Sequence, residues 1–150
     1  MTNKKILHFD DEPLISKTVG ESLHIIYGWD VRLVFEIDDL FRELQSNQYN
    51  AIIMDIMAPL PPLENEHITF TQEEIDEMYD GMNTGVILTE KIWRMGNYED
   101  LPVLFLSARS RPDIITKYQS DGHRCAYIKK PELAAIIDKE LRELLSKEQP

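Results

Sequence analysis

Short apolar runs alternate along the chain with segments whose apolar residues recur at helical spacing. The runs predict five strands, at residues 6–9, 31–35, 51–54, 103–106 and 125–128. The segments between them predict helices, one opening at Pro13 and the others over residues 38–44, 86–95, 111–119 and 133–145. Because the apolar runs are continuous rather than alternating, we expect both faces of the strands to be covered. The pattern predicts an α/β fold, a doubly wound five-stranded parallel sheet with helices on both faces.

Polar residues follow four of the predicted strands at the point where each strand ends. These residues are Asp10, Asp11, Asp55, Ser107 and Lys130. In doubly wound folds the functional site lies beyond the carboxyl ends of the strands, so these side chains are expected to converge. Three converging carboxylates repel one another unless a cation joins them, and Mg²⁺ suits carboxylate and phosphate oxygens. A nearby hydroxyl and ammonium would then complete a site for a phosphoryl group, with an aspartate as its nucleophile.

Four segments at these strand ends resemble the receiver domain of two-component response regulators. They are ILHFDDEP at residues 6–13, MDIMAP at 54–59, LSAR at 106–109 and YIKKP at 127–131. No one segment is specific, but their order and their places at strand ends together are. The resemblance covers nearly the whole chain and implies a flavodoxin-like receiver fold.

The resemblance also implies a role for each acidic residue. Asp55 corresponds to the phosphoacceptor of the family. The magnesium ligands would be Asp11, Asp55 and the backbone carbonyl of Met57, with Asp10 acting through a bound water or as a second acidic ligand. Taken singly, Asp10 and Asp11 are better explained as acidic residues that favour the dipole of the following helix than as metal ligands.

Three further residues correspond to the phosphoryl-binding and switch positions of the family. Ser107 would hydrogen-bond a phosphoryl oxygen, Lys130 would pair with it, and Tyr127 matches the aromatic that changes rotamer when the phosphoryl group binds. Lys129 is the competing lysine, but the family's lysine precedes a proline, commonly through a cis peptide, which favours Lys130. Alone, each is compatible with a helix cap, a solvated lysine or an aromatic at the edge of the core.

Two positions are expected to tune the lifetime of the phosphoryl group. Met57 and Arg109 lie two residues after Asp55 and Ser107, at family positions that influence how water reaches the phosphate. We expect the bulky, apolar Met57 to slow hydrolysis. The four histidines show no metal-ligand spacing and receive no function.

An acidic insertion, residues 60–82, departs from the family pattern directly after the phosphoacceptor strand. It is far longer than an ordinary βα loop. Its first part is proline-rich and extended, and Thr71 and Glu74 form a capping-box pattern that predicts a short acidic helix ending near Gly81, with Ile75, Met78 and Tyr79 on one face. Two roles stay open: a regulatory element that covers Asp55 or docks a partner, and a surface excursion packed on neighbouring helices.

Composition narrows the class of protein. The chain has 150 residues, one cysteine and a formal charge of −11, of which the insertion contributes seven acidic residues and no basic ones. This length is typical of one domain, so we expect residues 1–150 to form a single receiver domain. A deficit of basic residues argues against nucleic-acid binding. With no predicted membrane span, no signal-peptide core and no disulfide, a cytoplasmic protein is expected.

The function expected from this sequence is that of a stand-alone receiver. Asp55 would accept a phosphoryl group, with Mg²⁺, from a sensor histidine kinase or a histidine phosphotransfer protein, and a downstream protein would recognise the changed conformation. The protein would not be an enzyme beyond self-catalysed phosphoryl transfer and hydrolysis. The main alternative is a phosphorylation-independent interaction module with a receiver fold. A phosphatase is less favoured, because Asp55 is not followed two residues later by a second aspartate.

Overall fold

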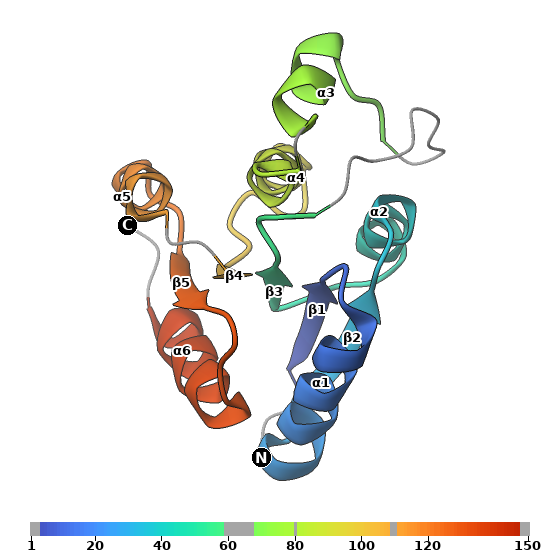
Figure 1. Ribbon diagram of the computed structural model, residues 1–150. Helices are drawn as coiled ribbons and strands as arrows, with labels where there is room; N and C mark the ends of the chain where they lie inside the picture. Colours follow the sequence, from blue (N-terminus) through green and yellow to red (C-terminus); the bar gives the residue numbers. More distant parts are fainter. Residues whose placement is uncertain (1–3, 59–67, 80, 109–110, 148–150) are drawn as a thin grey trace.

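Five parallel strands form one sheet in the computed structural model, which describes residues 4–58, 68–79, 81–108 and 111–147. The strands are β1 (Lys5–Phe9), β2 (Asp30–Val34), β3 (Ala51–Met54), β4 (Val103–Ser107) and β5 (Cys125–Lys129), in the order β2-β1-β3-β4-β5. The helices are α1 (Pro13–Tyr27), α2 (Ile37–Ser46), α3 (Gln72–Met78), α4 (Thr84–Trp93), α5 (Pro112–Ser120) and α6 (Ala134–Ser146). The predicted doubly wound fold is confirmed (Figure 1).

The two faces of the sheet carry separate hydrophobic cores. Helices α1 and α6 cover one face, where Leu23 and Leu141 pack against the strand residue Ile53. Helices α2, α4 and α5 cover the other, where Phe41 and Leu88 belong to the same cluster as the strand residues of that face. Alternate strand residues point to opposite faces, so continuous apolar strands supply both cores. No helix in the described part of the chain is long and apolar enough to cross a membrane.

The strand register aligns the carboxyl ends of the central strands. Phe9 of β1 pairs with Met54 of β3, and Met54 pairs with Phe105 of β4. Because these pairs are level, the residues that follow β1 and β3 emerge side by side at one edge. The register therefore brings Asp10 and Asp55 together although they are far apart in sequence.

Helix α1 buries a narrower face than its apolar residues suggest. Of Leu14, Ile15, Val19, Leu23 and Ile26, which mark its helical spacing, only Leu23 is buried; Leu14 is 84% exposed and Ile26 65%. The buried face of α1 also includes Ser16 and Gly20, which are small enough to lie close to the sheet. Exposed apolar residues on an amphipathic helix broaden its apparent apolar stripe, so the sequence pattern alone overstates what is buried.

The insertion contains the helix that the capping box predicts. The Thr71 side chain accepts from the Glu74 amide, and the Glu74 carboxylate accepts from the Thr71 amide, at the start of α3. The helix ends at Met78, earlier than expected, and Tyr79 is 78% exposed, so its placement on the buried face is wrong. Residues 60–67 and 80 of the insertion lie outside the described residues.

Helix α3 packs against α4, on the side away from the sheet (Figure 1). Met78 is fully buried, and Glu74 pairs with Lys91 of α4 at 2.9 Å. The chain rejoins the main fold through Gly81, whose carbonyl accepts from the Ala58 amide at 3.1 Å. This part of the insertion is therefore a packed excursion from the β3–α4 connection.

Candidate functional site

Three carboxylates meet at the carboxyl edge of the sheet. Asp10 and Asp11 follow β1 and Asp55 follows β3, and one oxygen from each lies within 4.8 Å of the others. Asp10 and Asp55 are each 2% exposed, whereas Asp11 is exposed. Backbone amides orient the buried pair: Glu12 donates to Asp10 Oδ1 at 2.9 Å, and Met57 donates to Asp55 Oδ1 at 3.1 Å.

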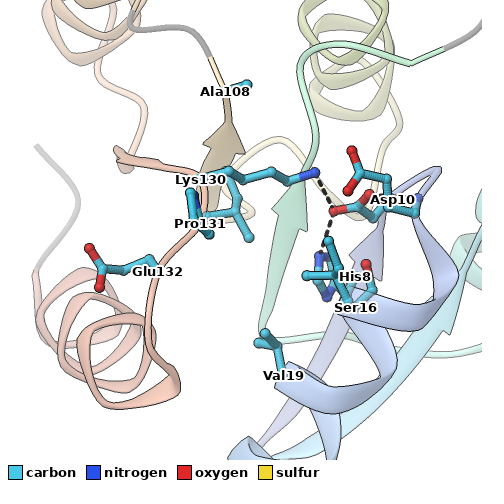
Figure 2. A pocket seen from close by; sticks show the side chains of 11 residues that line it. His8, Asp10, Ser16, Val19, Ala108, Lys130, Pro131 and Glu132 are labelled. Carbon is cyan, nitrogen blue, oxygen red and sulfur yellow. Dashed lines mark hydrogen bonds and ion pairs between the residues drawn. The ribbon is translucent and has the colours of Figure 1, made fainter.

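A single lysine reaches both buried carboxylates. The Lys130 ammonium lies 2.7 Å from Asp10 Oδ2 and 3.3 Å from Asp55 Oδ2, and Figure 2 shows it bridging to Asp10 from the opposite side of the site. The neighbouring Lys129 is exposed. The Lys130 amide donates to the Ser107 carbonyl, and the Lys130–Pro131 peptide is cis. The structure thus brings Lys130, rather than Lys129, to the acidic cluster.

Burial and neighbouring charge move the pKa values of the two buried aspartates in opposite directions. For Asp55, burial is the largest cause, and the hydrogen bond to Asp11 adds to it, so that its pKa rises to about 8 despite the nearby Lys130. For Asp10, burial acts in the same upward direction, but His8, Lys130 and the Glu12 amide together outweigh it and lower its pKa. Burial and the neighbouring carboxylates thus raise the pKa of Asp55, while hydrogen bonds and Lys130 lower that of Asp10.

The donor set fits a divalent cation. Three carboxylates within 4.8 Å of one another offer the hard oxygen ligands that Mg²⁺ prefers, and the exposed Asp11 leaves one side open to water or phosphate oxygens. The raised pKa of Asp55 reflects an electrostatic strain that such a cation would relieve. Asp10, Asp11 and Asp55 are the residues that would hold it. The proposed contribution of the Met57 carbonyl stays a prediction.

The phosphoryl-binding and switch candidates lie on the two neighbouring strands. Ser107 ends β4 and is fully buried, and its carbonyl accepts a hydrogen bond from the Tyr127 hydroxyl at 3.1 Å. Tyr127 pairs with Phe105 in the β4–β5 register. Met57, which follows Asp55 by two positions, is half-buried. Arg109, the second tuning candidate, lies outside the described residues.

Two features of the site were not foreseen from the sequence. His8 is 1% exposed, and its Nε2 atom lies 3.6 Å from Asp10 Oδ2. The sequence did contain a cue for His8, because a polar histidine inside an otherwise apolar strand is expected to be buried and to need a partner. Gly85 lies against the backbone of Asp55: its amide donates to the Ile56 carbonyl, and an added Cβ would lie 2.7 Å from Ile56 Cα.

Solved structures share this fold along almost their whole length. Chemotaxis response regulator CheY4 of Vibrio cholerae is 19% identical, with a TM-score of 0.69 over 95% of this chain and 99% of that chain. The receiver domain of Francisella response regulator 1452 is 22% identical, with a TM-score of 0.66 over 95% and 97%. The receiver domain of sensor histidine kinase PA1611 from Pseudomonas aeruginosa is 21% identical, with a TM-score of 0.65 over 97% and 100%, and has a magnesium ion coordinated in its active-site cleft.

The chain has the fold of response-regulator receiver domains. No protein-family model and no curated protein matches the sequence. At about one-fifth identity these likenesses define the fold alone, so the chemistry of the site rests on its own residues. The acidic cluster of Asp10, Asp11 and Asp55 fits the phosphoacceptor site that such a fold would carry.

Proposed function

We propose that this protein is a phosphoacceptor receiver of a two-component or phosphorelay system, with Asp55 as the phosphorylated residue. The observation that carries the proposal is the convergence of Asp55 with two further carboxylates and Lys130 at one edge of the sheet. Phosphoryl transfer depends chiefly on positioning and on neutralising the charge of the transferring group. This cluster supplies the nucleophile, an ammonium and oxygen ligands for a divalent cation.

In the proposed reaction, a carboxylate oxygen of Asp55 attacks the phosphorus of a phosphohistidine on the donor protein. The new O–P bond forms as the N–P bond breaks, and the departing imidazole takes up a proton from solvent. The Lys130 ammonium neutralises phosphoryl oxygens, and the Ser107 hydroxyl donates to one of them. Mg²⁺, when bound, neutralises charge on the phosphoryl oxygens. Attack of water on the same phosphorus breaks the aspartyl O–P bond, releases inorganic phosphate and regenerates the Asp55 carboxylate; the proposal includes no other reaction.

The proposed donor is a sensor histidine kinase or a histidine phosphotransfer protein, and the output is a conformational change recognised by a partner protein. Exposed apolar side chains support a protein donor. Leu14 and Leu133 closely follow Glu12 and Glu132, which line the cavity beside Asp10 and Lys130, and they are 84% and 72% exposed. Exposed apolar patches rimmed by polar residues are a feature of protein-binding surfaces.

The direct test is incubation of the full chain with Mg²⁺ and acetyl phosphate, followed by intact mass. The proposal predicts a phosphoryl adduct that forms with Mg²⁺ and is lost when a chelator is added beforehand. Equal modification with and without Mg²⁺ would argue against the role of the carboxylate cluster. No adduct with acetyl phosphate or with a phosphohistidine donor would favour the alternative, a phosphorylation-independent interaction module.

The insertion is the proposed source of a specific regulatory property. Ile68 and Phe70 are partly buried and pack against the same hydrophobic core cluster as Met57, so this segment lies on the face of the sheet that Met57 also contacts. We expect deletion of residues 60–82 to change the rates of phosphorylation or dephosphorylation. Unchanged rates would argue against a regulatory role and leave the other interpretation, a surface excursion packed on neighbouring helices.

For Met57 itself, Met57→Asn is expected to speed hydrolysis of the aspartyl phosphate, and an unaltered decay rate would contradict this.

A further inference from the structure

A cavity of about 290 Å³ opens between the first turns of α1 and the turn that joins β5 to α6. Figure 2 shows Asp10 and His8 on the α1 side of it and Lys130 and Pro131 on the other. Its apolar lining comes from Ile15, Val19, Leu106, Ala108 and Pro131. A dry, apolar protein cavity of roughly 150 Å³ binds benzene, so this one has room for a ring with a substituent.

Two buried polar side chains line this cavity without hydrogen-bond partners among the described residues. His8 and Ser16 are each 1% exposed, and neither ring nitrogen of His8 nor the Ser16 hydroxyl has a partner there. His8 Nε2 lies 3.6 Å from Asp10 Oδ2, a charge contact that is longer than a hydrogen bond. Buried polar groups are normally paired, so two neighbouring exceptions on one cavity wall indicate a place for a ligand's polar group.

The charges around the cavity indicate which charge the polar group of a ligand would carry. Asp10, Glu12 and Glu132 line it, opposed only by Lys130 among the described lining residues. Lys130 is already held by Asp10 and Asp55. This excess of carboxylates repels carboxylate and phosphate ligands and attracts a cation. A ligand ammonium also has N–H donors for the imidazole and the Ser16 oxygen.

We propose that this cavity binds a small amphipathic amine, with its ammonium toward His8 and Ser16 and its apolar body against Ile15, Val19 and Leu106. The cavity shares Asp10 and Lys130 with the carboxylate cluster. A bound ammonium would lie beside Asp10, the carboxylate that holds Lys130 at 2.7 Å. If the proposed function holds, such a ligand changes the rate of phosphorylation of Asp55; this consequence rests on that function, whereas binding does not.

The test is a ¹H–¹⁵N NMR titration of the full chain, without phospho-donor, using three probes that share one ring: benzylamine, benzyl alcohol and benzoate. Benzylamine should give saturable shifts confined to amides around the cavity, benzyl alcohol weaker ones and benzoate none. Shifts that do not saturate, that spread over the surface or that benzoate reproduces would overturn the proposal. Because no phospho-donor is present, failure here is distinct from failure of the proposed phosphorylation.

Two cavity variants, with one control on the same helix, test where benzylamine binds. Ser16→Ala removes one proposed acceptor and should weaken benzylamine binding about tenfold, equivalent to roughly 1.4 kcal/mol. Thr18→Ala removes an exposed hydroxyl from the same helix and should leave affinity unchanged. Val19→Phe fills the cavity and should abolish binding, with the spectrum of the free variant reporting that the fold is intact. Equal affinity of wild type and Ser16→Ala would overturn the assignment.

Discussion

The sheet-edge site and the insertion are built in opposite ways. The site joins residues from β1, β3, β4 and β5, and its buried ionisable groups pair across elements, as Lys130 does with Asp10 and Asp55. The described part of the insertion is organised locally, by the capping box at Thr71 and by packing of α3 on α4. Perturbing the site should therefore change chemistry and overall stability, whereas loosening the capped first turn of α3 should change little beyond α3.

A small set of contacts joins the site to the residues that flank the insertion. The Thr84 hydroxyl donates to the Ala58 carbonyl at 2.9 Å, and Gly85 lies against the backbone of Asp55. Arg111, just beyond β4, donates to the side chain of Asn83 at 2.6 Å. Movement in the segment after Ser107 therefore has a direct route to Asn83, the residue that follows the insertion.

The largest effect is expected from loss of the bridging lysine. Lys130→Ala leaves two buried carboxylates without their cation and removes the ammonium proposed to face the phosphoryl group. We expect the rate of phosphorylation by acetyl phosphate to fall about 100-fold, the scale of losing one oriented electrostatic contact. Lys129→Ala is the matched control, since Lys129 is exposed, and should retain the wild-type rate. Equal rates for the two variants would remove the distinction between these lysines.

Gly85→Ala should break the packing between α4 and the residues that follow β3. The added Cβ would lie 2.7 Å from Ile56 Cα and clash with the Asp55 carbonyl, so backbone must move. We expect a loss of about 3 kcal/mol in the free energy of unfolding, measured with denaturant. Gly96→Ala is the control, because nothing lies within 4 Å of its added Cβ. Similar stabilities would show that the close approach at Gly85 is tolerated.

The pH dependence of stability should report the strained carboxylate. The folded pKa of Asp55 is raised from 3.8 to about 8, so the folded state binds this proton more tightly than the unfolded state. Without metal, the free energy of unfolding should fall by several kcal/mol as pH rises between these values, because each unit of pKa difference corresponds to roughly 1.4 kcal/mol. Asp55→Asn and saturating Mg²⁺ should each flatten the profile, and Asp121→Asn, at an exposed position, should not. A profile unchanged in Asp55→Asn would contradict the raised pKa.

The smallest effect is expected at the start of α3. Thr71→Ala removes the capping side chain, which contributes about 1 kcal/mol. Hydrogen exchange of the α3 amides should accelerate about fivefold, while global unfolding and phosphorylation stay unchanged. A large drop in overall stability would show that the insertion is an integral part of the fold.

Local patterns were sufficient to predict most of the fold. Continuous apolar strands predicted a sheet covered on both faces, and Thr71 with Glu74 predicted the start of α3, because these signals act over a few residues. The face of α1 was less predictable, since Leu14 and Ile26 are apolar yet exposed. Periodicity records which residues are apolar but not which of them meet the sheet.

The residues of the site could be predicted because they follow the ends of strands. The contacts between their side chains were harder to predict. The order of strands brings Asp10 and Asp55 together, which sequence could indicate. The choice of Lys130 over Lys129 came from the family resemblance, because adjacent residues of one type carry no local distinction. The approach of His8 to Asp10 depends on three-dimensional packing, and its histidine was given no function.

The central claim is that Asp55 is the phosphoacceptor of this carboxylate cluster. The most direct measurement compares the intact masses of wild type, Asp55→Asn and Asp121→Asn after incubation with Mg²⁺ and acetyl phosphate. Wild type and the exposed-aspartate control Asp121→Asn should gain a phosphoryl adduct, and Asp55→Asn should gain none. An adduct that persists at the wild-type level in Asp55→Asn would contradict the claim.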